Sequence, residues 1–128
     1  MIINPEQARK LKDLGFPQDM YYGVYYYAEE STCPIPFLGT SLVKNFYVAP
    51  SLEQVAKWLR EEKDIDIEIT IDTREEKYKY GRIYIPQVLF CGTDGTLCKL
   101  QSLDVVCNSY EEALLAGIDA VVIKSELI

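Results

Sequence analysis

The sequence of 128 residues contains no histidine. Without an imidazole there is no Ser-His-Asp or Cys-His catalysis and no His-ligated metal site. The four cysteines are widely spaced and form no Cys-x-x-Cys motif, which argues against a zinc site. Because no Ser or Cys has a recognisable activating base either, we expect no catalytic residue, no metal ligand and no cofactor.

Long apolar runs are also missing from the sequence. None approaches the roughly 20 residues that a membrane-spanning helix needs. Residues 1–5 lack the basic and apolar regions of a signal peptide, so we expect a cytoplasmic protein. The net charge of −7 opposes binding to nucleic acid and to anionic membranes, because both need clustered Lys and Arg.

Three helices are predicted from their capping residues. The capping segments are residues 4–7, 51–54 and 109–112. In each, an Asn or Ser side chain can accept a hydrogen bond from a backbone N–H that has no partner inside the helix. We expect the first helix to end at Gly15, and we continue the third through Leu127. Residues 121–123 would also suit a strand, and that alternative stays open.

Residues 65–72 alternate isoleucine with polar residues without exception. Successive side chains of a strand point to opposite faces, so this pattern predicts a half-buried strand with one isoleucine face and one acidic face. Further strands are predicted over residues 20–28, 42–48 and from 80 or 81 to 91. We interpret residues 29–40 as a loop and the charged residues 73–79 as a connection.

Asp94-Gly95 is a strong hairpin signal and predicts a type I′ turn. This turn places Cys91 opposite Cys98, close enough for a disulfide. In a cytoplasmic chain we favour two reduced thiols. Pro86 interrupts the preceding strand, and we expect a bulge or a change of register there.

The order of these elements is helix, two strands, helix, three strands, helix. This order predicts an α+β fold, a mostly antiparallel sheet of about five strands with about three helices packed on one face. No linker divides the chain, so we expect a single domain over residues 1–128.

Ten tyrosines are the most unusual feature of the composition. Tyrosine is enriched at protein interfaces because it joins a large apolar ring to a polar tip. The candidate protein-binding surface consists of Tyr21, Tyr22, Tyr25, Tyr26, Tyr27 and Trp58. The competing interpretation is that one row of the tyrosine strand packs in the core and the other covers the sheet margin. Stacking of single-stranded nucleic acid on the rings is a further alternative, which lacks a basic track.

The acidic residues of the alternating strand are Asp64, Asp66, Glu68 and Asp72. Carboxylates two residues apart on a strand are separated by about 7 Å, too far to share one cation without help from another strand. We expect cross-strand ion pairs with Lys77, Lys79 or Arg82 instead. A metal-dependent or small-molecule enzyme assembled from carboxylates is the alternative, and so is self-association through an exposed strand.

Segments 7–16, 49–61 and 109–118 together resemble small uncharacterised proteins of bacteriophages, prophages and mobile elements of gut bacteria. The most specific part is Pro-Ser-Leu-Glu-Gln-Val-Ala-Lys-Trp-Leu-Arg-Glu, residues 50–61. The resemblance implies an α+β domain with an accessory role, acting by binding an unidentified host or phage protein. It brings no catalytic residue to this chain.

Overall fold

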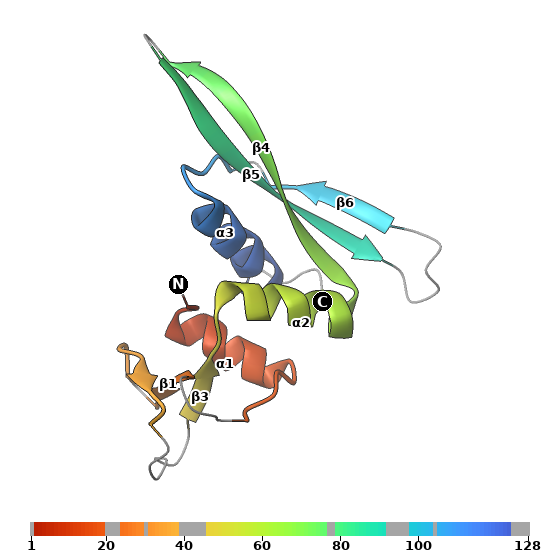
Figure 1. The fold of residues 1–128 in the computed structure, drawn as a ribbon. Helices are drawn as coiled ribbons and strands as arrows, with labels where there is room; N and C mark the ends of the chain where they lie inside the picture. Colours follow the sequence, from red (N-terminus) through yellow and green to blue (C-terminus); the bar gives the residue numbers. More distant parts are fainter. Residues whose placement is uncertain are drawn as a thin grey trace. The chain divides into compact units, whose positions relative to one another are not determined.

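The computed structural model describes residues 2–19, 24–29, 31–38, 46–76, 79–91, 98–103 and 105–123. The elements are α1 (Pro5–Asp13), β1 (Tyr25–Ala28), β2 (Ile35–Pro36), β3 (Phe46–Ala49), α2 (Leu52–Lys63), β4 (Ile65–Glu76), β5 (Lys79–Cys91), β6 (Cys98–Ser102) and α3 (Tyr110–Val122) (Figure 1). The predicted α+β class with antiparallel pairing is therefore confirmed.

The prediction of one sheet is wrong. The described strands form two antiparallel sheets of three strands each, in the orders β2-β1-β3 and β4-β5-β6. The central strand of each sheet, β1 or β5, is paired on both sides by neighbours in sequence, and α2 separates β3 from β4 along the chain. The chain divides into two compact units, Met1–Gln54 and Val55–Ile128. Their boundary falls inside α2, between Gln54 and Val55.

The first unit opens with the predicted capping box. The Asn4 side chain accepts from the Gln7 N–H at 2.8 Å, and the Gln7 side chain accepts from the Asn4 N–H at 3.0 Å. The helix ends at Asp13 with Leu14 as its C-cap, and Gly15 follows with a φ of 96°, a conformation that favours glycine. Both ends of α1 are therefore decided by residues within or next to it, as predicted.

The described part of the first unit's sheet confirms part of both predicted strands and adds a third. Strand character is confirmed for residues 25–28 and 46–48, while residues 20–23 and 41–45 lie outside the described residues. The predicted loop 29–40 contains the two-residue strand β2, which pairs Ile35 with Tyr26 and Pro36 with Tyr25. A proline is compatible with this position because β2 is the edge of the sheet and need not donate outward.

Both later helices begin at the predicted serines. Ser51 and Gln54 form a reciprocal capping box, with bonds of 2.9 and 3.3 Å. Ser109 accepts from the Glu112 N–H at 3.1 Å, but the Glu112 carboxylate accepts from the N–H of Asn108 rather than Ser109. Residues 121 and 122 are helical, so the strand alternative for 121–123 is wrong, and residues 124–127 lie outside the described residues.

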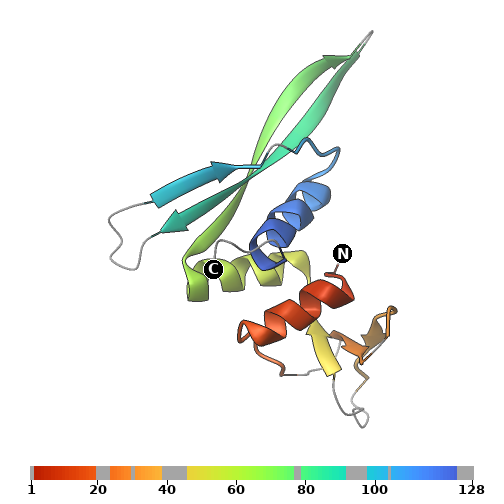
Figure 2. The same cartoon turned by 180° about the vertical axis from the view of Figure 1, so that it is seen from behind.

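The second unit is built on the long hairpin of β4 and β5 (Figure 2). Pairing runs in unbroken register from Ile65 opposite Phe90 to Glu76 opposite Lys79. The predicted charged connection over residues 73–79 is therefore wrong for residues 73–76 and 79, which belong to the strands, and residues 77 and 78 lie outside the described residues. β6 pairs with the second half of β5 and places Cys98 opposite Cys91, as predicted. The predicted turn at Asp94-Gly95 lies outside the described residues.

Pro86 causes neither a bulge nor a change of register, so that prediction is also wrong. Its carbonyl accepts from the Leu103 N–H at 3.2 Å, on the side of β5 away from β4. The N–H and C=O of one strand residue point to the same side, so the N–H that proline lacks would also face away from β4. The β4–β5 ladder therefore loses no hydrogen bond at this position.

The core of the second unit lies between α3 and the isoleucine face of the hairpin (Figures 1 and 2). Ile65 and Ile67 are buried, and so are Val88 and Ile118. A Cβ added at Gly117 would lie 2.5 Å from Ile67 Cγ2. This glycine lets the helix approach the strand closely.

Candidate protein-binding surface

The tyrosine strand is mostly buried where it is described. Tyr26 is 9 % exposed and Tyr27 is 4 % exposed, and the Tyr27 hydroxyl donates to the Ile3 carbonyl at 2.7 Å. Tyr26 and Tyr27 point to opposite faces of β1, so each face contributes a tyrosine to the core. Tyr25 is 41 % exposed. The other two candidate tyrosines, Tyr21 and Tyr22, lie outside the described residues.

Trp58 is partly exposed on α2, in the second unit. The Lys63 ammonium lies 5.6 Å from the centre of its ring, which is a cation–π contact. Among the described candidate residues, the structure brings together the three consecutive tyrosines of β1, of which Tyr25 alone is open to solvent. The described residues of β1 thus offer little exposed aromatic surface, and the interface predicted from the sequence stays a prediction.

A basic and aromatic cluster that the sequence analysis missed joins α1 to β3. The Lys12 ammonium lies 5.1 Å from the centre of the Tyr47 ring and 5.8 Å from that of Phe46. It also donates to the Phe46 carbonyl at 3.2 Å, and the Arg9 guanidinium lies 5.7 Å from the Tyr47 ring centre. These contacts of the Arg9 and Lys12 side chains lie within the first unit and help to hold α1 on β3.

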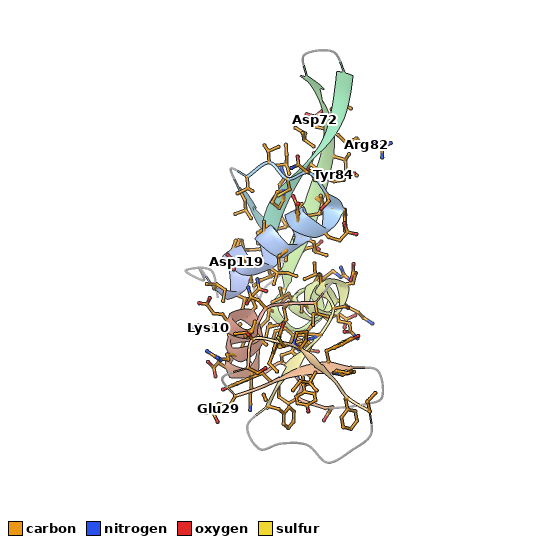
Figure 3. All side chains as sticks on the ribbon, turned by 90° about the vertical axis from the view of Figure 1, so that its left-hand side faces the viewer. Lys10, Glu29, Asp72, Arg82, Tyr84 and Asp119 are labelled. Carbon is orange, nitrogen blue, oxygen red and sulfur yellow. The ribbon has the colours of Figure 1, made fainter. Side chains whose placement is uncertain are left out.

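Of the cross-strand cations predicted for the acidic row of β4, the two within the described residues, Lys79 and Arg82, lie opposite other residues than Asp66, Glu68 and Asp72. The residues opposite Asp66, Glu68, Thr70 and Asp72 are Leu89, Gln87, Ile85 and Ile83. Arg82 pairs with Thr73, which places it on the isoleucine face, and Lys79 is opposite Glu76. Lys77 lies outside the described residues. Figure 3 shows Asp72, Arg82 and Tyr84 along the outer part of the hairpin.

Asp66 has a cation from elsewhere, since Arg60 of α2 lies 4.0 Å from its carboxylate. Within the described part of the chain, no group of three or more Asp, Glu or Cys side chains is close enough to hold a metal ion. The acidic row is therefore a charged surface without a cation site of its own there.

The described thiols have no activating neighbour. Cys33 is exposed and Cys107 is buried. Burial, and secondarily the charge of Glu112, raises the pKa of the Cys107 thiol, which keeps it protonated and unreactive. Burial also raises the pKa of Tyr27, with a smaller contribution from Cys33. These shifts follow from packing and are the opposite of what a nucleophile needs.

The isoleucine face of β4 extends beyond the helix that covers it. Ile65 is 3 % exposed and Ile67 is 8 % exposed, whereas Ile71 is 54 % exposed. Tyr84, opposite Ile71, is half-buried, and its backbone exchanges hydrogen bonds of 3.0 and 2.9 Å with Cys107. Ile71, Tyr84 and Cys107 therefore form a row across β4, β5 and the segment before α3. At this row, α3 no longer covers the isoleucine face.

More exposed apolar side chains flank this row. Val105, Val106 and Tyr110 are 44, 48 and 45 % exposed, and they lie within three residues of Cys107 along the chain. We call Ile71, Val105, Val106 and Tyr110 the distal apolar residues. A monomer gains nothing from leaving such side chains in water, and gathered exposed apolar residues mark contact sites for other molecules.

No described helix is both long and apolar enough to cross a membrane. Comparison of the chain with models of known protein families, with curated proteins and with solved structures gave no match.

Proposed function

We propose that this protein acts by binding another protein in the cytoplasm rather than by catalysis, and that the distal apolar residues form the contact surface. The observation that carries this proposal is the 54 % exposure of Ile71 on a strand whose inner isoleucines are buried. An isoleucine at this position gains free energy only when something covers it, at about 25 cal/mol per Å² of apolar surface.

This contact surface includes part of the β4–β5 hairpin and does not include the tyrosine strand. Tyr26 and Tyr27 have their area in the core of the first unit, so removing them would damage the fold rather than a binding site. The distal apolar residues contribute little to the core, because each is at least 44 % exposed. The likeness of residues 50–61 to phage and mobile-element proteins supports an accessory role, with a host or phage protein as the partner.

The test is affinity capture with matched variants. Ile71→Thr removes the apolar side chain and keeps a β-branched residue suited to a strand. Leu38→Thr is the control, because Leu38 is 59 % exposed but belongs to the first unit. Both variants should keep the stability of the wild type within about 0.5 kcal/mol, as surface substitutions do.

Tagged wild type and both variants are incubated with lysate of the organism that encodes the protein, and bound proteins are identified by mass spectrometry. We expect a partner that is retained by Leu38→Thr and lost by Ile71→Thr. Capture of the same proteins by all three forms would reject the distal surface. Loss in both variants would also reject the distal apolar residues as the specific contact.

A further inference from the structure

Among the described residues, no strand pairs with the outer edge of β4, and the hydrogen bonds of β5 identify which backbone groups lie along that edge. Pro86, opposite Ile69, directs its carbonyl to Leu103. Tyr84, opposite Ile71, directs both its N–H and its C=O to Cys107. In an antiparallel pair, two residues directly opposite each other direct their backbone N–H and C=O groups either toward each other or both away from each other. The N–H and C=O groups of Ile69 and Ile71 therefore lie at the open edge, and the two-residue period adds Ile67.

A hydrogen bond of Thr73 agrees with this assignment and occupies the next N–H along the edge. Thr73 is the next residue in the same series, and its N–H donates to the Asp72 carboxylate at 2.7 Å. A ladder bond to β5 would have used that N–H. No described strand pairs with the outer edge of β4, which is the first strand in its sheet. The donors without a described strand partner thus include those of Ile67, Ile69 and Ile71.

The side chains beside this edge select what could pair with it. On one face are the isoleucines, whose outer members are partly or largely exposed. On the other face are Asp66, Glu68 and Asp72, opposite which β5 supplies only uncharged residues. An added strand would place every second residue beside the isoleucines and the others beside the carboxylates.

We propose that β4 binds an extended segment of its partner protein as an additional strand, and that this segment alternates apolar residues with Lys or Arg. The proposal rests on the protein-binding function given above and names the chemistry of the partner. Backbone hydrogen bonds to Ile67, Ile69 and Ile71 would supply affinity, and the acidic row would select basic residues.

A second copy of β4 meets like charges in the registers that pair the isoleucines most fully. An antiparallel pair centred on Ile69 places Asp66 opposite Asp72 of the other copy, and one centred on Thr70 places Glu68 opposite Asp72. Like charges directly opposite each other destabilise a strand pair. The acidic row therefore opposes self-association in these two registers and favours a segment of opposite charge.

The probe is a synthetic peptide, acetyl-Lys-Val-Lys-Val-Lys-Val-Lys-amide, and the readout is amide hydrogen exchange of the full-length protein followed by NMR. In the free protein, the amides of Ile67, Ile69 and Ile71 should exchange at least tenfold faster than those of Glu68 and Thr70, which are bonded to β5. Saturating peptide should slow the three isoleucine amides by tenfold or more and leave the other two unchanged.

Two modified peptides separate strand addition from simple charge attraction. A residue placed beside an isoleucine of β4 directs its N–H toward that strand, so N-methylation of the valines should abolish binding. N-methylation of the lysines alters amides that point away and should leave the affinity within about threefold. Glu68→Gln should weaken binding by about two- to fivefold, the range for one exposed ion pair.

Equal binding of the two methylated peptides would overturn the proposal, and so would slow exchange of the isoleucine amides in the free protein. A peptide that fails to bind, together with loss of the captured partner in Ile71→Thr, would reject strand addition and keep the distal surface. Peptide binding together with a partner retained by Ile71→Thr would support the edge and reject the distal residues as the main contact.

Discussion

Gly117→Ala tests how closely α3 approaches β4. Alanine is the better helix former by about 1 kcal/mol, so the substitution would stabilise an uncrowded helix. Here the new Cβ would lie 2.5 Å from Ile67 Cγ2, a distance that real Cβ atoms essentially never show. Cγ2 is attached directly to Cβ of a buried, β-branched side chain, so it cannot move aside without shifting the strand or the helix.

Overpacking of this kind costs about 1–3 kcal/mol. After subtraction of the helix propensity, we expect Gly117→Ala to lower the free energy of unfolding by about 1 kcal/mol. Ile67→Ala alone should cost about 2–5 kcal/mol, because it leaves a cavity under α3. In the Ile67→Ala background the clash is gone, and Gly117→Ala should then stabilise by about 1 kcal/mol.

The assay is urea unfolding of the wild type, the two single variants and the double variant, followed by circular dichroism. The change of sign between backgrounds corresponds to a coupling energy of about 2 kcal/mol. If Gly117→Ala stabilised the wild type and the Ile67→Ala variant equally, the close approach of α3 to β4 would be refuted.

Three further predictions concern single contacts. Tyr27→Phe should cost about 1 kcal/mol, because it removes the buried hydrogen bond to the Ile3 carbonyl; an unchanged urea midpoint would contradict that bond. Asn4→Ala should cost about 1 kcal/mol through loss of the α1 cap, and Asn4→Asp should restore most of it in the same assay. Burial and the charge of Glu112 raise the pKa of Cys107, so the folded state favours the neutral thiol. The unfolded chain then loses its proton first as pH rises, and stability falls above the ordinary thiol pKa; Cys107→Ala should flatten this alkaline fall in urea midpoints measured across pH.

The exposure of Ile71 could not be predicted from the sequence. The predicted strand over residues 65–72 would be about 26 Å long, and a helix over residues 110–127 would be about 27 Å long, so one helix would cover one strand. In the structure, β4 has 12 residues and α3 has 13, which makes the strand about 40 Å and the helix about 20 Å long. The isoleucine row itself, from Ile65 to Ile71, spans only about 20 Å, so the length of α3 does not decide the exposure of Ile71. Where α3 lies along the hairpin decides it.

The tyrosine strand shows a different limit. Alternation predicts which tyrosines share a face but not which face is covered. Tyr25 and Tyr27 point to the same side of β1, yet Tyr27 is buried through its bond to Ile3 and Tyr25 is not. The residue that accepts this bond, Ile3, lies 24 positions away in the sequence, so no local pattern predicts the contact.

The sequence by itself determined the beginnings of the three helices and the α+β class. It also determined the alternation of the isoleucine strand and the pairing of Cys91 with Cys98. Each of these depends on groups a few residues apart, or on the two-residue period of a strand, so the information is local. For the described residues, the tertiary structure alone decided that the strands form two sheets and that Pro86 fits an unbroken ladder. It also decided that no described strand pairs with the outer edge of β4 and that Ile71 is exposed. Those outcomes depend on which distant segment packs where and on how far it reaches, because burial is a property of the whole packed chain.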